Sequence, residues 1–355
     1  MPQLLLIVNP GSTSTKLALF DGDRMMAQQT VNHDNIELAR FDNVADQFGY
    51  RMEAVDHWID SLKLIDHSLS AVVGRGAPLR PLEGGSYQIT DRMITELRER
   101  LHSNHASNLG AIIARHLGER FGVPSLISDP ITVDNFSALA RISGVPEIER
   151  KCRVHALNIK EVCRREAIKA NKQLEQVNFV CAHMGGGISV AALEKGRVID
   201  VNDALLGMGP FSPDRAGALP IGPLVKLCFS GKYSEQELID KLSKKSGLVA
   251  YLGASDLREV EKMIENGDSN AQFHFDAMAY QIAKEIGAAA TVLKGQYQSI
   301  VLTGGMAHSS RLTKAITDQI GFLGDVVLVP GEYEMEALAA AGVRFLSGQE
   351  SLKVY

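Results

Sequence analysis

Residues 6–19 read Leu-Ile-Val-Asn-Pro-Gly-Ser-Thr-Ser-Thr-Lys-Leu-Ala-Leu, an apolar strand, a turn of small residues and a second apolar strand. Asn9 and Gly11 open the turn, hydroxyl side chains fill it, and Lys16 closes it. A hairpin tip rich in backbone N–H groups and hydroxyls is suited to holding phosphoryl oxygens. This stretch therefore predicts a phosphate-binding hairpin in the first twenty residues.

The same pattern of strand, glycine-rich turn and strand returns at residues 178–193, around the run Gly185-Gly186-Gly187. A third glycine pair, Gly304-Gly305, follows a strand that begins at Ile300. The repetition predicts a duplicated α/β fold with a nucleotide held between two lobes. We expect residues 1–150 to form an N-terminal lobe and residues 151–330 a C-terminal nucleotide-binding lobe. Residues from about 331 to 355 should pack back on the first lobe.

Short apolar runs and longer helical patterns alternate along the chain. The clearest helix spans residues 43–62, where apolar residues recur every three or four positions and Arg51 falls among the polar residues of the other face. We expect it to be a core helix without a part in catalysis. Strands are expected at 4–8, 15–20, 71–73, 125–128, 178–182, 188–193, 299–303 and 326–329.

Composition excludes several classes of protein. A chain of 355 residues, 45% hydrophobic and 22% charged, is long enough for two cored domains. A net charge of −5 argues against nucleic-acid binding, and no apolar run reaches the 18 residues of a membrane span. The first residues carry no basic segment of a signal peptide, so we expect a cytoplasmic protein. The four cysteines show no metal-binding spacing and are expected to be reduced thiols.

The common nucleotide and hydrolase motifs fail on spacing. Gly231-Lys232 lacks the upstream glycine of a P-loop, and Gly185-x-Gly187 is followed by Val190 where a dinucleotide-binding turn needs glycine. The sequence also has no GxSxG nucleophile turn. The remaining candidates are the three glycine-containing turns described above, which are suited to phosphate binding and follow one another along the chain.

Five separated motifs resemble the successive motifs of acetate and butyrate kinases. They are Asn9-Pro-Gly-Ser-Thr-Ser-Thr-Lys16, His105-Ala-Ser-Asn108, Ser128-Asp-Pro130, His183-Met-Gly-Gly-Gly187 and Thr303-Gly-Gly305. The resemblance covers nearly the whole chain, and the forms NPGSTSTK, HMGGG and KGRVIDVNDAL are closest to the butyrate kinases. It implies the duplicated actin-like ATPase (ribonuclease H-like) fold that sugar kinases and heat-shock chaperone ATPases share.

The resemblance also implies a reaction. Such an enzyme transfers the γ-phosphoryl group of ATP to a short-chain carboxylate, giving an acyl phosphate and ADP, and runs in reverse to make ATP. It implies Mg²⁺ as cofactor, lobe closure that excludes water, and a homodimer or larger homo-oligomer. Two alternatives stay open: an acetate or propionate kinase, and a nucleotide-dependent binding or assembly ATPase of the same fold.

The catalytic residues carried over from the resemblance are two arginines, two histidines and an aspartate. Arg75 and Arg215 would clamp the carboxylate and the moving phosphoryl group. His183 would donate to that group, although a histidine before three glycines is also typical of a core residue. His105 is either a substrate-side donor near a helix N-terminus or a capping residue.

Two acidic residues are expected at the metal. A carboxylate substrate is already ionised near pH 7, so no general base is needed, and we assign Asp129 to Mg²⁺. Glu334 matches the second acidic residue of the family, although Glu332 and Glu336 lie close in sequence.

The nucleotide-binding residues come from the turns. The first turn would contribute Asn9, Gly11, Ser12, Ser14 and Lys16, and the second Gly185, Gly186 and Gly187. Gly304 and Gly305 would lie against the adenosine. Asp256 and Arg258 would join them there, unless they form only a helix start with an exposed ion pair.

Overall fold

The structure is a computed structural model that describes residues 3–63 and 69–355. Its chain forms two compact units, unit 1 from Met1–Val133 with Tyr333–Tyr355 and unit 2 from Asp134–Glu332. Residues 1–2 and 64–68 of the predicted first lobe lie outside the described residues. The boundary between the units lies after residue 133 rather than near the predicted residue 150, because residues 134–150 form hydrogen bonds with a strand of unit 2. Ser137 N–H donates to Ile199 O at 3.0 Å, and Arg150 Nη2 pairs with Asp200 at 2.8 Å.

Unit 1 is built on a six-stranded sheet in the order β3-β2-β1-β4-β6-β5. The first three strands form an antiparallel meander, β1, β4 and β6 run parallel, and β5 is antiparallel to β6. The strands are β1 (Leu4–Pro10), β2 (Ser14–Asp21), β3 (Arg24–Asn32), β4 (Leu69–Arg75), β5 (Ser86–Gln88) and β6 (Ser125–Ser128).

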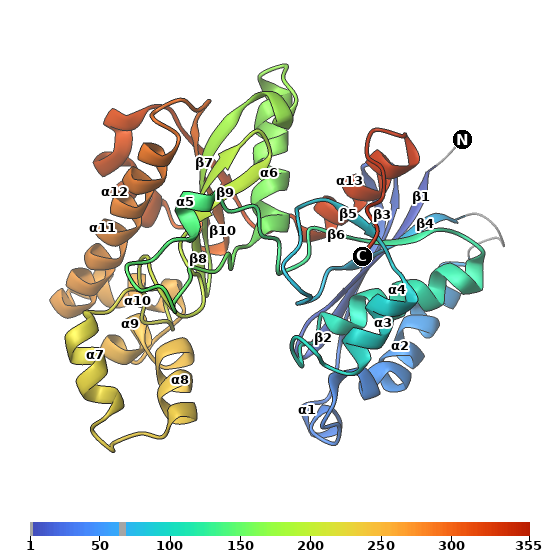
Figure 1. Cartoon of the computed structure of the whole chain (residues 1–355), viewed down its shortest axis with the longest axis horizontal. Helices are drawn as coiled ribbons and strands as arrows, with labels where there is room; N and C mark the ends of the chain where they lie inside the picture. Colours follow the sequence, from blue (N-terminus) through green and yellow to red (C-terminus); the bar gives the residue numbers. More distant parts are fainter. Residues whose placement is uncertain (1–2, 64–68) are drawn as a thin grey trace. The chain divides into compact units, whose positions relative to one another are not determined.

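Helices cover both faces of this sheet (Figure 1). Helix α4 packs on β1, β4 and β6 beside α2, and α13 packs on the same three strands from the other face. Gly342 of α13 permits this contact, because a Cβ there would meet Leu5 Cδ2 at 2.9 Å. The helices of unit 1 are α1 (Asn35–Leu38), the 3₁₀ turn η1 (Val44–Gln47), α2 (Phe48–Ser61), α3 (Asp91–Arg98), α4 (Asn108–Phe121) and α13 (Glu334–Leu346).

Unit 2 contains a five-stranded sheet in the order β11-β10-β7-β8-β9. Strands β7, β8 and β9 form an antiparallel meander, and β7, β10 and β11 run parallel. The strands are β7 (Asn178–Met184), β8 (Ile188–Glu194), β9 (Arg197–Val201), β10 (Ile300–Gly304) and β11 (Val326–Pro330).

The two sheets therefore repeat one topology, a three-stranded meander whose first strand is extended by two parallel strands. The order β3-β2-β1-β4-β6 in unit 1 corresponds to β9-β8-β7-β10-β11 in unit 2. The duplication that the sequence predicts is confirmed.

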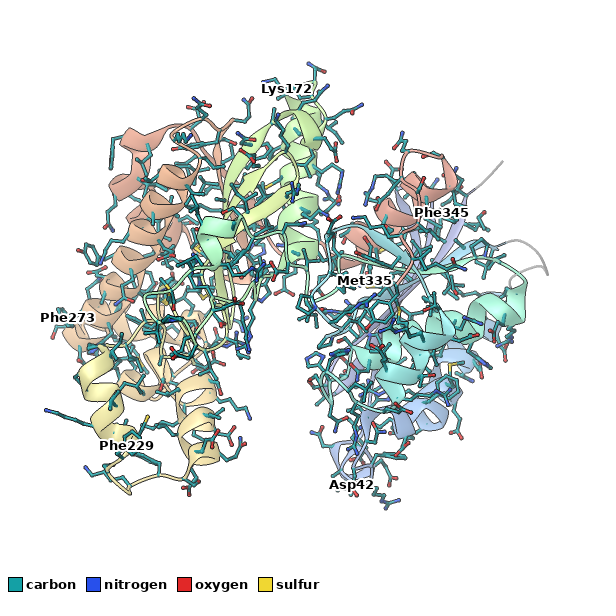
Figure 2. All side chains as sticks on the ribbon, viewed as in Figure 1. Asp42, Lys172, Phe229, Phe273, Met335 and Phe345 are labelled. Atoms are coloured by element: carbon teal, nitrogen blue, oxygen red, sulfur yellow. The ribbon has the colours of Figure 1, made fainter. Side chains whose placement is uncertain are left out.

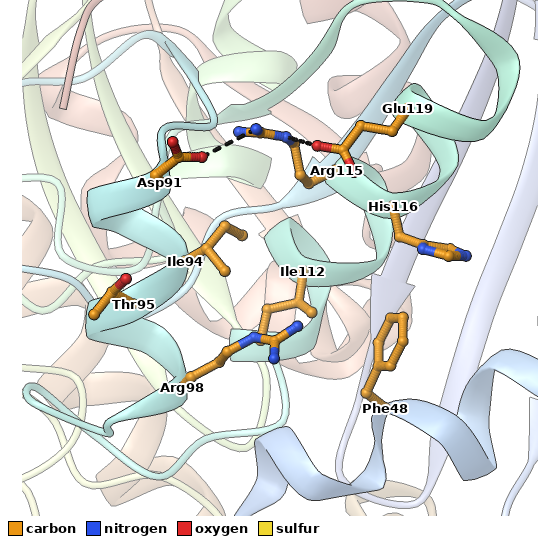
Figure 3. A pocket seen from close by; sticks show the side chains of 9 residues that line it. All are labelled: Phe48, Asp91, Ile94, Thr95, Arg98, Ile112, Arg115, His116 and Glu119. Atoms are coloured by element: carbon orange, nitrogen blue, oxygen red, sulfur yellow. Dashed lines mark hydrogen bonds and ion pairs between the residues drawn. The ribbon is translucent and has the colours of Figure 1, made fainter.

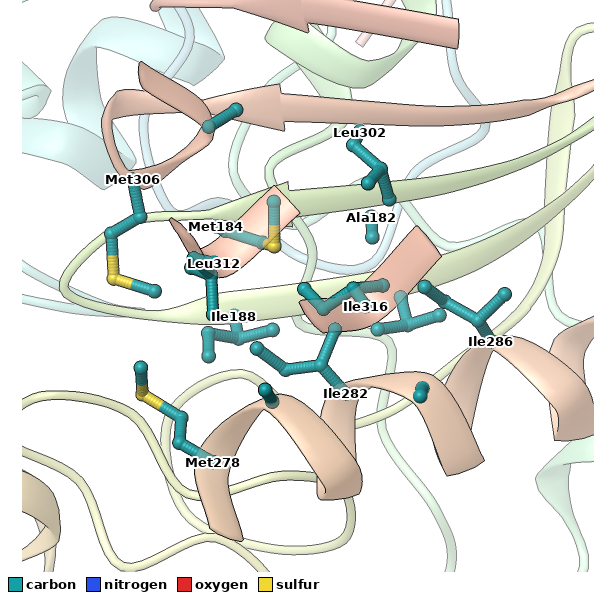
Figure 4. Packing of buried hydrophobic residues seen from close by; sticks show 14 of the residues in the cluster. Ala182, Met184, Ile188, Met278, Ile282, Ile286, Leu302, Met306, Leu312 and Ile316 are labelled. Atoms are coloured by element: carbon teal, nitrogen blue, oxygen red, sulfur yellow. The ribbon is translucent and has the colours of Figure 1, made fainter. Parts of the chain in front are cut away.

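The sheet of unit 2 lies between α6 on one face and α11 with α12 on the other (Figure 1). Its largest core joins the even-numbered side chains of β7 to α11 and α12, with Ala182 and Met184 near Ile282 and Ile316 (Figure 4). The odd-numbered side chains of β7 consequently face α6. The α-helices are α5 (Ala138–Arg141), α6 (Ala156–Lys169), α7 (Ile221–Cys228), α8 (Glu235–Lys244), α9 (Gly247–Leu252), α10 (Leu257–Glu265), α11 (Ser269–Val292) and α12 (Ser310–Ile320), and the 3₁₀ turns are η2 (Leu174–Gln176), η3 (Gly305–His308) and η4 (Gly321–Leu323).

Some aromatic side chains stay outside these cores. Phe229 after α7 is 88% exposed, and Phe273 on α11 is 69% exposed (Figure 2). Among the described residues, no helix has the length and apolar character needed to span a bilayer.

The eight expected strands are all present, whereas β3, β5 and β9 were not anticipated. Strand β3 is exposed along most of its length, so its sequence lacks the alternation that marks a half-buried strand. The expected helix at 43–62 is η1 followed by α2. One expectation for it was wrong, because Arg51 is fully buried instead of lying on the solvent face.

Candidate active site

Three predicted site residues of unit 1 meet where parallel strands end. Asn9 lies near the end of β1, Arg75 is the last residue of β4, and Asp129 directly follows β6. Arg75 pairs in register with Ser128, and Val8 with Gly74, so all three side chains start from one edge of the sheet. Ligands of open α/β sheets bind at such carboxyl ends.

Glu334 joins this group from the first turn of α13. Its Oε2 accepts from Arg75 Nη1 at 2.8 Å and from Asn9 Nδ2 at 2.9 Å, and Arg75 Nη1 also lies 3.1 Å from Asn9 Oδ1. The side chains of Arg75 and Glu334 are only 26% and 18% exposed. The structure thus brings together a guanidinium, a carboxylate and an amide from three elements far apart in the sequence.

The glycines on either side of Arg75 serve close packing. A Cβ on Gly74 would lie 2.3 Å from Gly110 O of α4, and a Cβ on Gly76 would lie 2.5 Å from Pro130 Cα. Only glycine allows backbone to approach backbone at these distances. The two glycines therefore hold the Arg75 backbone against α4 and the Asp129–Pro130 segment.

Asp129 has an unusual backbone conformation. Its φ of +39° lies in the left-handed region, which aspartate tolerates better than most residues. Oδ1 accepts from Gly85 N–H at 2.8 Å, while Asp129 N–H donates to Gly85 O at 3.0 Å. The buried carboxylate is thus fixed in one orientation at the sheet edge.

His105 lies just before α4, which begins at Asn108. Its Nδ1 accepts from Ser107 N–H at 3.2 Å and lies 2.7 Å from Ser107 Oγ. Partial burial and the nearby charge of Arg75 lower the pKa of His105, which favours the neutral ring. With Nδ1 as the acceptor, Nε2 carries the proton. Both alternatives for His105 have support, since the ring bonds the first turn and also lies near the Arg75 charge.

The tip of the first hairpin is held from below by Arg51. Its Nη1 donates to Gly11 O at 2.9 Å and to Ser14 O at 3.2 Å, and its Nη2 donates to Ser12 O at 3.0 Å. Gln47, one turn earlier on the chain, accepts from Arg51 Nε at 3.1 Å. Ser12 is exposed and Ser14 half-buried at the tip, and Lys16 is exposed in β2 opposite Asn9.

Unit 2 contributes His183, at the end of β7 on the face that packs against α6. Asn158 of α6 places Nδ2 at 2.9 Å from His183 Nδ1 and donates to Thr303 Oγ1 at 3.3 Å. Because this amide nitrogen is a donor, His183 Nδ1 is the acceptor and Nε2 carries the proton. Nε2 is directed to the glycine tip, where it would lie 3.5 Å from a Cβ on Gly185. The ring of His155 stacks on His183 with centroids 4.1 Å apart.

The second hairpin tip, Gly185–Gly187, lies against Arg215. A Cβ on Gly187 would lie 2.3 Å from Arg215 Nη1, so only glycine leaves room for this guanidinium. Arg215 Nη1 donates to Ala204 O at 2.6 Å. Ser212 Oγ donates to Gly186 O at 2.5 Å and accepts from Arg215 N–H at 3.2 Å, which joins the arginine loop to the tip.

The predicted adenosine residues lie on separate elements of unit 2. Gly304 ends β10 with a φ of +90°, and a Cβ there would lie 2.3 Å from Met184 O, so it packs directly on β7. Gly305 begins η3. Asp256 caps α10 by accepting from Arg258 N–H at 2.9 Å, and its carboxylate pairs with the Arg258 guanidinium at 2.6 Å. Arg258 is 86% exposed, as expected for the helix start with an exposed ion pair.

The acidic residues of the site do not form a complete metal-binding cluster by themselves. Within residues 3–63 and 69–355, no group of three His, Cys, Asp or Glu side chains is close enough to hold a metal. Asp129 and Glu334 are nevertheless oxygen donors of the type that Mg²⁺ prefers, and Mg²⁺ in kinases takes only one or two protein carboxylates beside water and phosphate oxygens. The residues present fit a magnesium ion bound mainly through phosphate.

A hollow on unit 1 lies apart from the predicted site residues. It lies between α3, α4 and the start of α2, and Figure 3 shows Arg115 within it, paired with Asp91 and Glu119. None of the predicted site residues lines it. Arg115, one of the two arginines that line it, is paired with two carboxylates.

Sequence reasoning missed three residues of these two clusters. Arg51 looked like one more polar residue of a helix face, and Asn158 lay in a basic helical stretch without a motif. Glu332 was noted only as a neighbour of Glu334, yet its Oε1 would lie 3.9 Å from a Cβ on Gly185, near the second tip. No local pattern predicts these three contacts, because each joins elements that are far apart in the sequence.

Comparison with known proteins identifies the family of the chain. The model of the acetokinase family matches residues 147–351. A protein of Caldanaerobacter subterraneus subsp. tengcongensis named "Probable butyrate kinase 2" is 46% identical over 351 residues, which is 99% of each chain.

Two solved structures share the fold at low sequence identity. The acetate kinase of Porphyromonas gingivalis superposes with a TM-score of 0.78 at 19% identity, covering 97% of this chain and 100% of that one. A propionate kinase of Francisella tularensis subsp. tularensis gives a TM-score of 0.73 at 18% identity, covering 96% of this chain and 98% of that one. The predicted actin-like ATPase fold is confirmed. By its family match and its full-length relative, the chain belongs to the acetokinase family.

Proposed function

We propose that this chain is a butyrate kinase, which transfers the γ-phosphoryl group of ATP to the carboxylate of butyrate or a related short-chain fatty acid. The observation that carries the proposal is the 46% identity, over 99% of both chains, to a protein named for that activity. The clusters in both units fit the chemistry, because they gather cations and hydrogen-bond donors and include no group that has to remove a proton from the substrate.

The reaction needs no general base. A carboxylate oxygen attacks the γ-phosphorus, an acyl O–P bond forms, and the bond from the γ-phosphorus to the β,γ-bridging oxygen breaks. ADP leaves with the electron pair, and no proton has to move. Catalysis therefore depends on positioning and on neutralising the negative charge of the transferred group.

In unit 1, Arg75 is the cation for the carboxylate and the moving phosphoryl group, and Asn9 and Glu334 fix its orientation. Ser12, Ser14 and Lys16 provide hydroxyls and a positive charge for phosphoryl oxygens. His105 is assigned to the substrate side as a neutral donor. Asp129 and Glu334 would hold the metal, and Mg²⁺ when bound would neutralise charge on the phosphate oxygens.

In unit 2, His183 donates from Nε2 in the tautomer that Asn158 fixes, and Arg215 supplies the second guanidinium beside Gly187. Gly185 and Gly186 offer backbone N–H groups to phosphate. Gly304 and Gly305, with Asp256 and Arg258, are assigned to adenosine. The homo-oligomeric state and a cytoplasmic location are further parts of the proposal.

The test is acyl phosphate formation. Purified protein is incubated with ATP, Mg²⁺ and butyrate, and the product is trapped with hydroxylamine, with the acid omitted in the control. We expect hydroxamate and ADP in equal amounts, and neither without the acid. ATP hydrolysis that ignores the acid, with no hydroxamate, would reject a carboxylate kinase and favour an ATP-driven binding protein.

A further inference from the structure

The first hairpin tip has a buried arginine beneath it. Arg51 in α2 is fully buried, and its guanidinium contacts only neutral groups: the carbonyl oxygens of the tip, Thr15 Oγ1 and the Gln47 amide. In the part of the chain that the structure describes, no carboxylate lies within 4 Å of it. A buried guanidinium without an acidic partner is costly, so a compensating anion is expected nearby.

We infer that Arg51 is a positioning residue for the phosphoryl group: it holds the carbonyl oxygens of the tip inward, so that the amides of Ser12 and Thr13 and the hydroxyls of residues 12–14 face the anion. This inference rests on the proposed function, which places phosphoryl oxygens at this turn. Arg51 acts through the turn and does not touch the substrate.

All four carbonyl oxygens of the tip are taken by protein donors. Arg51 bonds those of Gly11, Ser12 and Ser14, and the last also accepts from Gly11 N–H at 2.7 Å. The Thr13 carbonyl accepts from His33 N–H at 2.8 Å. None of these oxygens is left to repel an incoming phosphate.

Two amide donors of the tip are left available to a ligand. Within residues 3–63 and 69–355, the N–H groups of Ser12 and Thr13 donate to no protein acceptor, and both residues are exposed. Consecutive backbone N–H groups in a turn can bind an anion when no protein acceptor takes them. The phosphoryl oxygens supply the missing acceptors.

Arginine suits this position better than lysine. Its fork reaches three carbonyl oxygens at once, whereas an ammonium is a single point donor. Gln47 accepts from Nε at 3.1 Å and from Nη2 at 2.9 Å, which sets the plane of the fork. Burial lowers the pKa of the Arg51 guanidinium to about 10, so it remains charged at neutral pH and adds a positive charge below the anion.

The test compares the affinities for ATP and AMP, which share adenosine but differ in phosphoryl groups. Isothermal titration gives both affinities for wild type, Arg51→Met and Arg51→Lys. We expect Arg51→Met to weaken ATP binding at least tenfold and AMP binding less than twofold. Arg51→Lys, which keeps the charge but loses the fork, should fall between wild type and Arg51→Met.

Arg344→Met is the matched control. Arg344 is another largely buried arginine of unit 1, paired with Glu350 at 2.8 Å and placed outside the turn. Its loss should lower the melting temperature and leave the ratio of the two affinities unchanged. A folded Arg51→Met protein with wild-type ATP affinity, or with equal losses for ATP and AMP, would overturn the inference.

If Arg51→Met does not fold, Gln47→Met decides the matter. This variant leaves Arg51 in place and removes the acceptor that orients it, so ATP affinity should fall severalfold; unchanged affinity would overturn the inference. The hydroxamate assay on wild type keeps the two claims apart. Protein that makes no acyl phosphate refutes the proposed function, whereas an acyl kinase whose ATP affinity ignores Arg51 refutes only the inference.

Discussion

The two hairpin tips have the same place in the two repeated sheets but use arginine in opposite ways. The tip between β1 and β2 has hydroxyl side chains, and Arg51 bonds its carbonyl oxygens from the buried side. The tip between β7 and β8 is Gly185–Gly187, and Arg215 lies directly against its last glycine, with 26% of its side chain exposed.

Under the proposed function, Arg51 is a supporting cation and Arg215 is a cation that contacts the reacting group. A guanidinium that donates its N–H groups to carbonyl oxygens stabilises the turn. A guanidinium that is partly exposed beside glycine can contact a ligand. Repeated topology thus provides two equivalent turns, and the residues of each turn set how an arginine contacts it.

The largest effects are expected at groups assigned to the reacting atoms. Arg215→Ala and Asp129→Asn should each lower kcat by about 100-fold or more, the scale observed when a charge-stabilising donor is removed. Initial rates of hydroxamate formation measure this, with melting temperature as the control for folding. Normal turnover in either variant would remove that residue from the mechanism.

Asn158→Asp tests the tautomer of His183. The carboxylate would accept a proton from Nδ1, so that Nε2 can donate only when the ring is an imidazolium. We expect a loss of about 10- to 100-fold near neutral pH, the range seen when the partner that orients a metal-ligating histidine is changed. The variant should also acquire a new decline in kcat as the pH rises. A pH profile parallel to wild type would mean that Asn158 does not set the tautomer.

Gly187→Ala tests whether the second tip needs room for Arg215. The new methyl group would lie 2.3 Å from Nη1, so the guanidinium must move, and we expect kcat to fall about tenfold. The same change at Gly185 meets its nearest atom at 3.5 Å, an ordinary contact, and should cost less. Equal losses in the two variants would contradict a specific role for Gly187.

The smallest effect is a pH dependence of the free energy of unfolding, caused by His33 next to the first hairpin. Burial, and then the positive charge of Arg51, lower the pKa of His33 from 6.5 to about 4. The unfolded chain therefore protonates His33 more readily than the folded chain does. The neutral His33 ring contributes its full stabilisation above pH 6.5, and this stabilisation is lost as the pH falls towards 4. We expect a loss of about 1–2 kcal/mol after partial solvent screening. Urea unfolding at several pH values measures it, and His33→Asn should flatten the dependence; an equally steep curve for the variant would assign the loss to other groups.

The sequence was most informative at the turns that follow strands, where the family motifs lie. Five ordered motifs predicted the family, the fold and a carboxylate-phosphotransferase class, and the family match and full-length relative confirm them. The structure also groups Asn9, Arg75 and Glu334, which lie up to 325 positions apart, although the roles of the site residues stay predictions.

What could not be predicted depends on contacts between elements. Arg51 has the periodicity of a solvent-facing residue, and only the position of α2 under the hairpin makes it a buried donor. Asn158 contacts His183 only because the alternation of side chains along β7 directs His183 towards α6. Strand β3 is an exposed edge strand whose side chains carry no core pattern. Local sequence encodes turns and strands, whereas these three features arise only from packing.

The most direct test of the account is kcat/KM for acyl phosphate formation across acetate, propionate, butyrate, isobutyrate and valerate under one set of ATP and Mg²⁺ concentrations. We expect the highest value for butyrate. A maximum at acetate or propionate would keep the phosphotransferase but contradict its assignment as a butyrate kinase, and no activity with any acid would contradict the account as a whole.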